Sequence, residues 1–326
     1  MIRQGLGTRH AHHQQHQGGA ALLLAMVVLT LVATLAAGMV WQQTRAIHVE
    51  AAERARAQLG WMLSAGVDFA REVVRRYADT DPRRGQPWDA NLEETRLSAL
   101  LAADRDNSAD GALEAFISGR ISDAQSRYNL RRLINPQGEV VKAEAATLKR
   151  LCEAIGLPGT DETLLAGLQK AWAPTGTERA ADATVALRRP EHLAWLGIDA
   201  PTLKALLSFV DILPAGDTGI NLNTAPREVI YAVMEGIDLG TAARLVRAAD
   251  NRFTSVEEAR AAVGLNSSVD TGGTKLTVKP RFFYAHATVR FEDRAVTELA
   301  LLERLGEGSA ATVVVRRSSR VPSAAM

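Results

Sequence analysis

Histidine and cysteine are the side chains of this sequence that are best suited to metal or nucleophilic chemistry. Four of the seven histidines, His10, His12, His13 and His16, lie among glutamines in a short polar head. This composition is that of a polar tract, and we assign no metal site to it. The other three histidines are far apart and stand beside no nucleophile. Their spacing therefore predicts no catalytic or metal constellation.

The one cysteine, Cys152, excludes an internal disulfide bond. It shares an apolar helical face with Leu148, Leu151 and Ile155, so we interpret it as a small core residue. The sequence contains no G-x-S-x-G, Walker or H-E-x-x-H signature. We therefore predict that the chain is not an enzyme, with no catalytic residues.

An acidic run, Asp104 to Gly111, has a spacing loosely like that of a calcium loop. The glycine and the closing glutamate of an EF-hand are not in register, which favours a solvated turn. We predict no cofactor and assign no metal ligands. Calcium stays possible but doubtful.

Two polar motifs stand out against this background. The first, within Ala115 to Asn135, has Ile121, Asp123, Gln125, Arg127, Asn129 and Leu130 at alternating positions followed by a pair. Asp and Asn in such a place satisfy backbone groups of a turn more often than they catalyse. We therefore predict structural roles for Asp123 and Asn129.

The second motif is Ile220-Asn-Leu-Asn-Thr-Ala-Pro226, which contains Asn221, Asn223, Thr224 and Pro226. We predict that Thr224 caps a helix opened by Pro226. Helix, glycine and helix follow, which resembles helix-hairpin-helix modules whose amides bind phosphate. A membrane-tethered DNA-binding or DNA-uptake protein is therefore the alternative function, although acidic residues offset the basic ones in this stretch.

The second motif lies within a stretch whose periodicity predicts helices. From 142 to 264 three units share a plan of helix, turn and helix, with turn glycines Gly156, Gly197 and Gly236. Asp199 is a predicted N-cap, and Ser255 with Glu258 predicts a capping box. We expect an autonomous all-α domain here, whose removal spares the rest.

Strands are predicted on both sides of the helical block, and apolar residues alternate within 281–292. The predicted strands are 116–121, 281–292, 295–305 and a short edge strand at 312–317, with a loose tail at 318–326. A short helix is predicted at 92–101. The helical block thus interrupts a strand-forming region.

An uncharged stretch of 22 residues, Ala20 to Trp41, precedes all of these elements. As a helix it would be roughly 33 Å long, enough to cross a membrane core. Its predicted anchor residues are Leu22, Leu23, Leu24, Val28, Leu31 and Trp41. An amphipathic helix continues to about residue 78, with Leu59, Met62, Gly66, Phe69 and Val73 on its predicted buried face.

This arrangement resembles the type IV pilin and pseudopilin superfamily. The resemblance implies a leader removed by prepilin peptidase between Gly19 and Ala20, with methylation of the new N-terminus. Most pilins have a glutamate at the fifth mature position, where this chain has Leu24. That departure, the Gly19-Ala20-Ala21-Leu22-Leu23 start and both polar motifs are similar to the K-type minor pseudopilins of type II secretion (GspK).

The resemblance implies an α+β pilin-like fold, in which a long N-terminal helix and a small antiparallel sheet carry a large inserted helix-hairpin-helix-like domain. The implied segments are a leader at 1–19, a helix at 20–78, pilin-like parts at 79–141 and 265–317, an insert at 142–264 and a tail at 318–326. One departure concerns calcium: the family's W-x-D-x-D-type segment is replaced by Trp172 to Glu178, without an aspartate pair.

The implied function is that of a structural minor pseudopilin at the tip of the pseudopilus, in the export of folded proteins across the outer membrane. Implied partners are the I-, J- and H-type minor pseudopilins, the major pseudopilin, prepilin peptidase and the inner-membrane secretion platform. The implied location is the inner membrane, single-pass, with a cytoplasmic N-terminus and a periplasmic domain. The formal charge of +1, or −1 without the leader's Arg3 and Arg9, predicts no nucleic-acid partner.

Overall fold

The computed structural model describes residues 18–77, 86–96, 115–173, 187–265, 275–291, 294–306 and 310–323. The chain divides into two units, 1–58 and 59–326, which are described separately. The leader up to residue 17, the acidic run at 104–111 and most of the 172–178 segment lie outside the described residues.

Helix α1, Gly18–Arg76, contains no proline and begins with the predicted anchor. In the first unit the large apolar side chains between Leu22 and Trp41 are 52% to 71% exposed. Among the described helices, α1 is the one whose length and composition suit a membrane span, with a mean hydropathy of 2.6 over its most apolar window. The helix therefore fits a membrane anchor.

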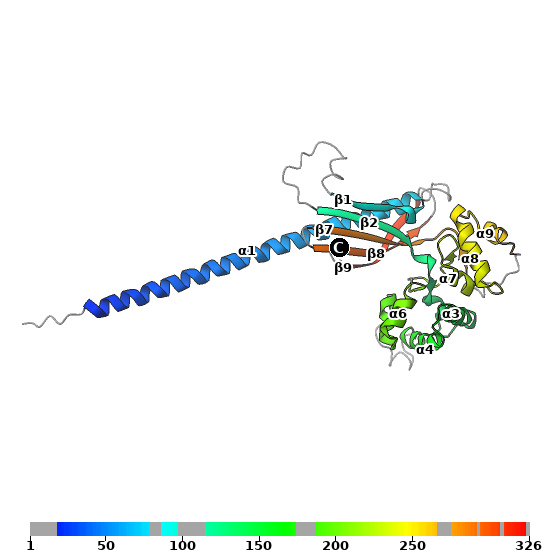
Figure 1. The fold of residues 1–326 in the computed structure, drawn as a ribbon, viewed down its shortest axis with the longest axis horizontal. Helices are drawn as coiled ribbons and strands as arrows, with labels where there is room; N and C mark the ends of the chain where they lie inside the picture. Colours follow the sequence, from blue (N-terminus) through cyan, green and yellow to red (C-terminus); the bar gives the residue numbers. More distant parts are fainter. Residues whose placement is uncertain are drawn as a thin grey trace, which may run out of the picture. The chain divides into compact units, whose positions relative to one another are not determined.

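In the second unit, the end of α1 packs against a sheet (Figure 1). The helix buries Leu63, Val67, Ala70 and Val74, flanked by Leu59, Met62 and Val73. Gly66 lies against Ala287, where an added Cβ would come within 2.9 Å of the alanine methyl group. The prediction for Phe69 was wrong, because its side chain is 64% exposed.

The sheet has five antiparallel strands in the order β1-β2-β7-β8-β9. Their bounds are β1 Asn91–Arg96, β2 Ala115–Asp123, β7 Phe282–Phe291, β8 Arg294–Leu305 and β9 Thr312–Ser323. Alternation puts one apolar set, including Ile117, Ala285 and Leu302, on the face that contacts α1. β2 and β7 are neighbours although the helical region separates them in sequence, and Asp123 pairs with Phe283.

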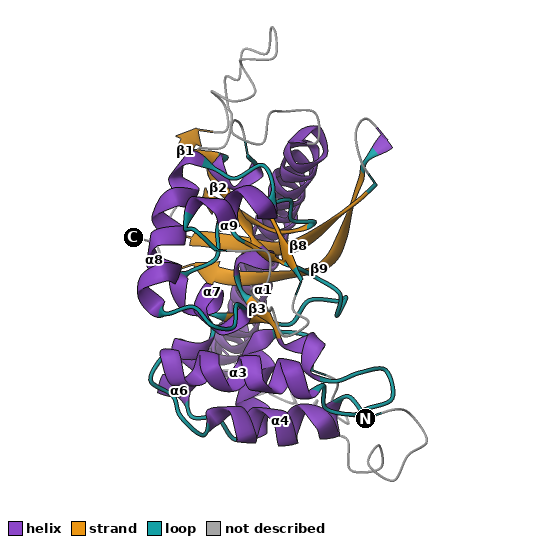
Figure 2. Cartoon of the chain, turned by 90° about the vertical axis from the view of Figure 1, so that its right-hand side faces the viewer, coloured by secondary structure: helices purple, strands orange, loops and turns teal. Residues whose placement is uncertain are grey.

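In the sequence, the helical region lies between β2 and β7. Figure 2 shows α3, α4 and α6 on one side of it and α7, α8 and α9 on the other. The bounds are α3 Lys142–Ala154, α4 Thr160–Ala171, α6 Ala200–Leu206, α7 Arg227–Val233, α8 Leu239–Ala248 and α9 Val256–Ala262. Short parallel pairs join β3 Tyr128–Asn129 to β4 Val210–Asp211, and β5 Ile220–Asn221 to β6 Leu276–Thr277.

The predicted turns and caps of this region are largely confirmed. Gly156, Gly197 and Gly236 have φ values of 76°, 83° and 82°, a conformation that favours glycine. Asp199 caps α6 by accepting from the Thr202 amide at 2.9 Å. Ser255 caps α9, and the Glu258 carboxylate binds the backbone amide of Thr254.

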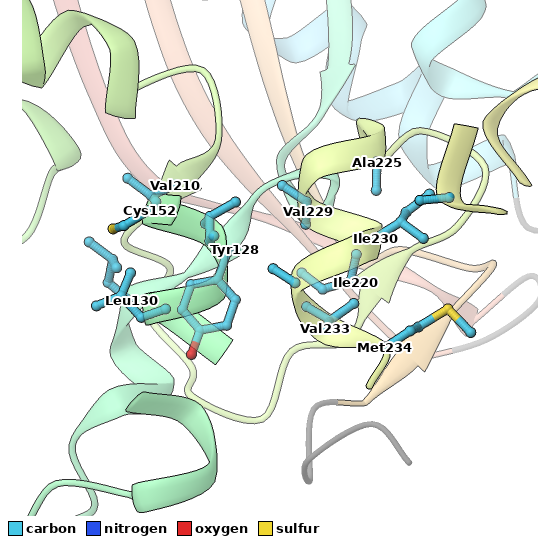
Figure 3. Close-up of a cluster of buried hydrophobic side chains, with 14 of the residues drawn as sticks. Tyr128, Leu130, Cys152, Val210, Ile220, Ala225, Val229, Ile230, Val233 and Met234 are labelled. Carbon is cyan, nitrogen blue, oxygen red and sulfur yellow. The ribbon is translucent and has the colours of Figure 1, made fainter. Parts of the chain in front are cut away.

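One buried core holds all of these short helices together (Figure 3). It includes Cys152, which is 0% exposed, as predicted. It also includes Tyr128, Leu130 and Leu133, which precede residue 142, and Val278, which follows residue 264. The domain bounds at 142 and 264 stay a prediction, but the core around the helices extends beyond both.

The predicted helix before Gly197 is present as a 3-10 helix, η5, Pro190–Leu196. Two predictions of local structure were wrong. Residues 92–96 of the predicted helix form β1, because their backbone pairs with β2 and Leu92 reaches the sheet core. Residues 318–323 of the predicted tail belong to β9, since their backbone continues the ladder with β8.

Candidate functional site

The two polar motifs meet at the junction between the sheet and the helical region. Asp123, at the end of β2, is buried, and its Oδ2 accepts from Asn221 Nδ2 at 2.6 Å and from the Thr224 hydroxyl. Its Oδ1 accepts from the Gln125 amide at 2.7 Å. The predicted Thr224 cap is therefore wrong: this hydroxyl binds Asp123, and α7 begins after Pro226 without a side-chain cap.

Burial dominates the electrostatics of Asp123 and raises the pKa of its carboxyl group to about 6. The donors Thr224, Asn221 and the Gln125 amide oppose this effect, as does the positive charge of Arg127. At neutral pH the ionised carboxylate thus depends on these donors. The contact therefore joins two segments that are 98 residues apart in sequence.

Gln125 connects three more points of the junction. Its Oε1 accepts from the backbone amides of Arg281 and Phe282, at 2.7 and 3.1 Å, where β7 begins. Its Nε2 donates to the Gly219 carbonyl at 2.6 Å, just before β5. The first motif thereby fixes the start of β7 and the start of β5 to the end of β2.

Asn129 and Asn223 also act on backbone groups, which supports the predicted structural roles. Asn129 Oδ1 accepts from the amides of Arg131 and Leu213, while its Nδ2 donates to Ala215 O and Thr218 Oγ1, all within 3.1 Å. Asn223 binds both the amide and the carbonyl of Phe253, at 2.8 and 3.0 Å. These amides hold loops of the helical region in place.

Two buried clusters were missed by the sequence interpretation. Arg132 and Glu144, with side chains 7% and 5% exposed, form an ion pair at 2.5 Å, and Tyr128 donates to the same carboxylate at 2.7 Å. Asp211 accepts from the Tyr284 hydroxyl at 2.8 and 2.7 Å and from Arg317 at 3.2 Å. An acid within the apolar run Phe209–Leu213 was the available signal for the second cluster.

The second cluster also joins the sheet to the helical region, because Tyr284 is on β7 and Asp211 on β4. Burial raises the pKa of Asp211, and the Arg317 guanidinium opposes that effect most strongly. Arg317 further donates to the carbonyl of Ile212 at 2.7 Å. The junction groups thus satisfy one another, an arrangement suited to holding two regions in a fixed relation.

The helix hairpin of α7 and α8 does not offer a free anion site. Asp238 Oδ1 accepts from the Thr241 amide at 2.6 Å, and hydrogen bonds from the hydroxyl and amide of Thr241 lower the pKa of the Asp238 carboxyl group. A carboxylate of the chain itself therefore occupies the N-terminus of α8, where a nucleic-acid phosphate would bind. This disfavours the DNA-binding alternative.

Calcium is not tested by the described residues. None of them form a group of three His, Cys, Asp or Glu side chains arranged to hold a metal ion. Both stretches that bear on calcium, 104–111 and 172–178, lie wholly or mostly outside the described part of the chain. The expectation that the chain holds no cofactor therefore stays a prediction.

A second candidate feature is the face of α1 that the sheet leaves uncovered, which we call the outer helix face: Trp61, Ala65 and Phe69. Trp61 is 80% exposed and Phe69 64% exposed, and the three residues are four apart, so they form one stripe. Large exposed aromatic side chains commonly mark interfaces with partners.

The processing and anchor residues all lie in α1. Gly19 and Ala20 are in its first turn, and the cleavage between them stays a prediction. The predicted anchor side chains Leu22, Leu23, Leu24, Val28, Leu31 and Trp41 are all at least half exposed.

Comparison with known proteins confirms the predicted resemblance. Residues 220–279 match the family described as Type II secretion system (T2SS), protein K. Type II secretion system protein K of Pseudomonas aeruginosa is 26% identical over 90% of both chains. The protein of the same name from Pectobacterium carotovorum is 23% identical, over 90% of this chain and 94% of its own.

The fold comparison agrees. One chain in the crystal structure of the GspK-GspI-GspJ complex of enterotoxigenic Escherichia coli matches with a TM-score of 0.61 and 17% identity. The match covers 83% of this chain and 99% of that one. The predicted α+β fold, with a long apolar helix, an antiparallel sheet and a helical domain, is confirmed.

Proposed function

We propose that this chain is a K-type minor pseudopilin, a structural component at the tip of the type II secretion pseudopilus. The observation that carries the proposal is similarity along nearly the whole chain, from the apolar helix through the interrupted sheet to the helical region. The relatives that share this plan are named type II secretion system protein K. The chain acts in the export of folded proteins by assembling, and it catalyses no reaction.

Leu24 and the outer helix face support a position at the tip. In the family, the glutamate at the fifth mature position pairs with the N-terminal amine of the neighbour assembled before it. The first subunit has no such neighbour, and an unpaired carboxylate in the membrane would be costly. Leu24 therefore suits a first subunit, and the exposed Trp61 and Phe69 are available to contact the helices of its partners.

The proposal includes a location. Residues 20–41 cross the inner membrane once, with the N-terminus in the cytoplasm and the sheet and helical region in the periplasm. Prepilin peptidase cuts between Gly19 and Ala20. Gly19→Val should leave the leader attached, which mass spectrometry of the membrane-extracted protein detects; a mature N-terminus between Ala36 and Gly38 would instead indicate an ordinary signal peptide.

Partner binding tests the function directly. Residues 46–326 should co-purify with the I- and J-type pseudopilins as a ternary complex. The double variant Trp61→Ser/Phe69→Ser should weaken that complex by at least about tenfold, because it removes two aromatic anchors. Trp195→Ser, which changes an indole that is 54% exposed on η5, is the matched control. Failure of the unmodified protein to form the complex would contradict the proposed function.

A further inference from the structure

One face of the sheet is covered by α1, and the opposite face is not covered along most of its length. Near the helical region, Tyr284 and Leu301 are buried on this opposite face. Further along the strands its side chains are half-buried or exposed, as at Ser118, Arg120 and His286. The described residues therefore leave a polar sheet surface open to a partner.

Positive charge gathers on this surface around a neutral histidine. His286 on β7 is opposite Arg120 on β2, and its Nε2 is 3.4 Å from the Ser122 hydroxyl. Burial lowers the pKa of His286 to about 4, and the charges of Arg120 and Arg127 contribute to the lowering. We call Arg120, Ser122, Arg127 and His286 the cationic sheet face.

The charges of this group are not balanced by the described residues. Arg290, on the same side of β7, is paired with Glu94 at 2.6 Å. Arg120 has no ion pair with a described residue, and Arg127 is 3.8 Å from Asp211. Asp211 also accepts from Tyr284 and Arg317, and the charge of Arg127 acts on the buried Asp123 carboxyl group as well. These two acids offset Arg127 in part, so Arg120 supplies most of the excess charge. The cationic sheet face therefore has an excess of positive charge within a near-neutral chain.

We propose that the cationic sheet face docks a carboxylate-bearing loop of a neighbouring pseudopilin, which binds between Arg120 and Arg127 beside His286. The assignment of the partner rests on the proposed function. Guanidinium groups bind carboxylates through two parallel hydrogen bonds, and the Ser122 hydroxyl adds a third donor. An open sheet surface is accessible to a loop of another protein.

The local charge pattern favours an acidic protein over a nucleic acid. Glu94 lies at the edge of the same face, and the N-terminus of α8 is already occupied by Asp238. A nucleic acid would require an extended row of cations, whereas this group is confined to two arginines. An acidic loop needs no more than one or two carboxylates.

The experiment uses the mature protein in detergent and the purified I- and J-type pseudopilin pair as the probe. Affinity is measured at two salt concentrations for wild type, for Arg120→Gln/Arg127→Gln and for the matched control Arg244→Gln/Arg247→Gln on α8. The first variant should lose about tenfold or more in affinity and most of the salt dependence, because it removes the charge-assisted contacts. The control should stay within about twofold.

A second readout separates a docking role from a structural one. The pKa of His286, followed by NMR titration, should rise when the partner binds, since a carboxylate offsets the two arginines. An unchanged affinity in the Arg120→Gln/Arg127→Gln variant, or an unchanged His286 pKa on binding, overturns the proposal while leaving the proposed function intact. No binding by wild type overturns both.

Discussion

The sheet and the helical region of the second unit reach stability by different routes. The five strands are 6 to 12 residues long and form continuous antiparallel ladders, with α1 covering one face. The helices between β2 and β7 are 7 to 13 residues long, too short to be stable alone in water. They depend on one shared core and on buried polar contacts at the junction.

Because of this difference, the sheet should stay folded when the helical region is deleted. The helical region, in contrast, should lose stability when single side chains at the junction are changed. Backbone pairing brings Asp123 and Phe283 together without help from the helices. The helical region has no comparable ladder among its described residues, since its strand pairs are two residues long. Four predictions test the comparison, beginning with the largest expected effect.

Two deletions should give opposite results. Replacing residues 125–280 by a short Gly/Ser linker should leave a cooperatively unfolding sheet, because the cut ends are already paired and short loops close at little cost. Replacing 142–264 should instead cause aggregation, since Tyr128, Leu130 and Leu133 lose their cover. Circular dichroism melts and limited proteolysis measure both. Cooperative unfolding of the variant that lacks 142–264 would instead support the predicted bounds of the insert.

Asn221→Ala should lower the free energy of unfolding by about 3 kcal/mol at pH 7, because it takes a donor from a buried carboxylate. Asn91→Ala, the same substitution at an exposed position of β1, should stay within about 0.5 kcal/mol. Denaturant titration measures both changes. Equal effects at the two positions would mean that the junction contributes little.

The pH dependence of stability follows from the carboxyl group of Asp123. Its pKa is about 6 in the folded protein and 3.8 for a solvated aspartate, so between these values the folded chain keeps a proton that the unfolded chain releases. The free energy of unfolding therefore falls by about 3 kcal/mol from this group as the pH rises from about 4 to about 6. In Asn221→Ala this decrease in the free energy of unfolding should extend to higher pH, because the loss of the Asn221 donor raises the pKa of Asp123 further. A profile identical to wild type would contradict this assignment.

Gly236→Ala should have the smallest effect, about 1 kcal/mol of lost stability. The added methyl group meets no atom within 4 Å, so the loss comes from the φ of 82° alone. Gly240→Ala lies inside α8 and should be neutral or stabilising. A thermal melt that ranks these two variants in reverse would disprove the role of this turn.

The sequence by itself determined the elements whose signal is local. An uncharged 22-residue run, period-two alternation in β7, and glycines after helical segments each depend on their own neighbourhood in the sequence, and each was predicted correctly. The family resemblance also rested on local features, namely the long apolar helix and the two polar motifs. These can be recognised from residue types and their spacing along the chain.

Tertiary structure alone decided the features that depend on distant partners. Residues 92–96 form a strand because β2 lies beside them, and Thr224 gives its hydroxyl to Asp123 rather than to the helix that follows it. Phe69 is exposed although its spacing suits the buried face, because the sheet covers a stripe of α1 rotated from the predicted one. The partners of Asp211 and His286 come from strands far away in sequence, and only folding brings them together.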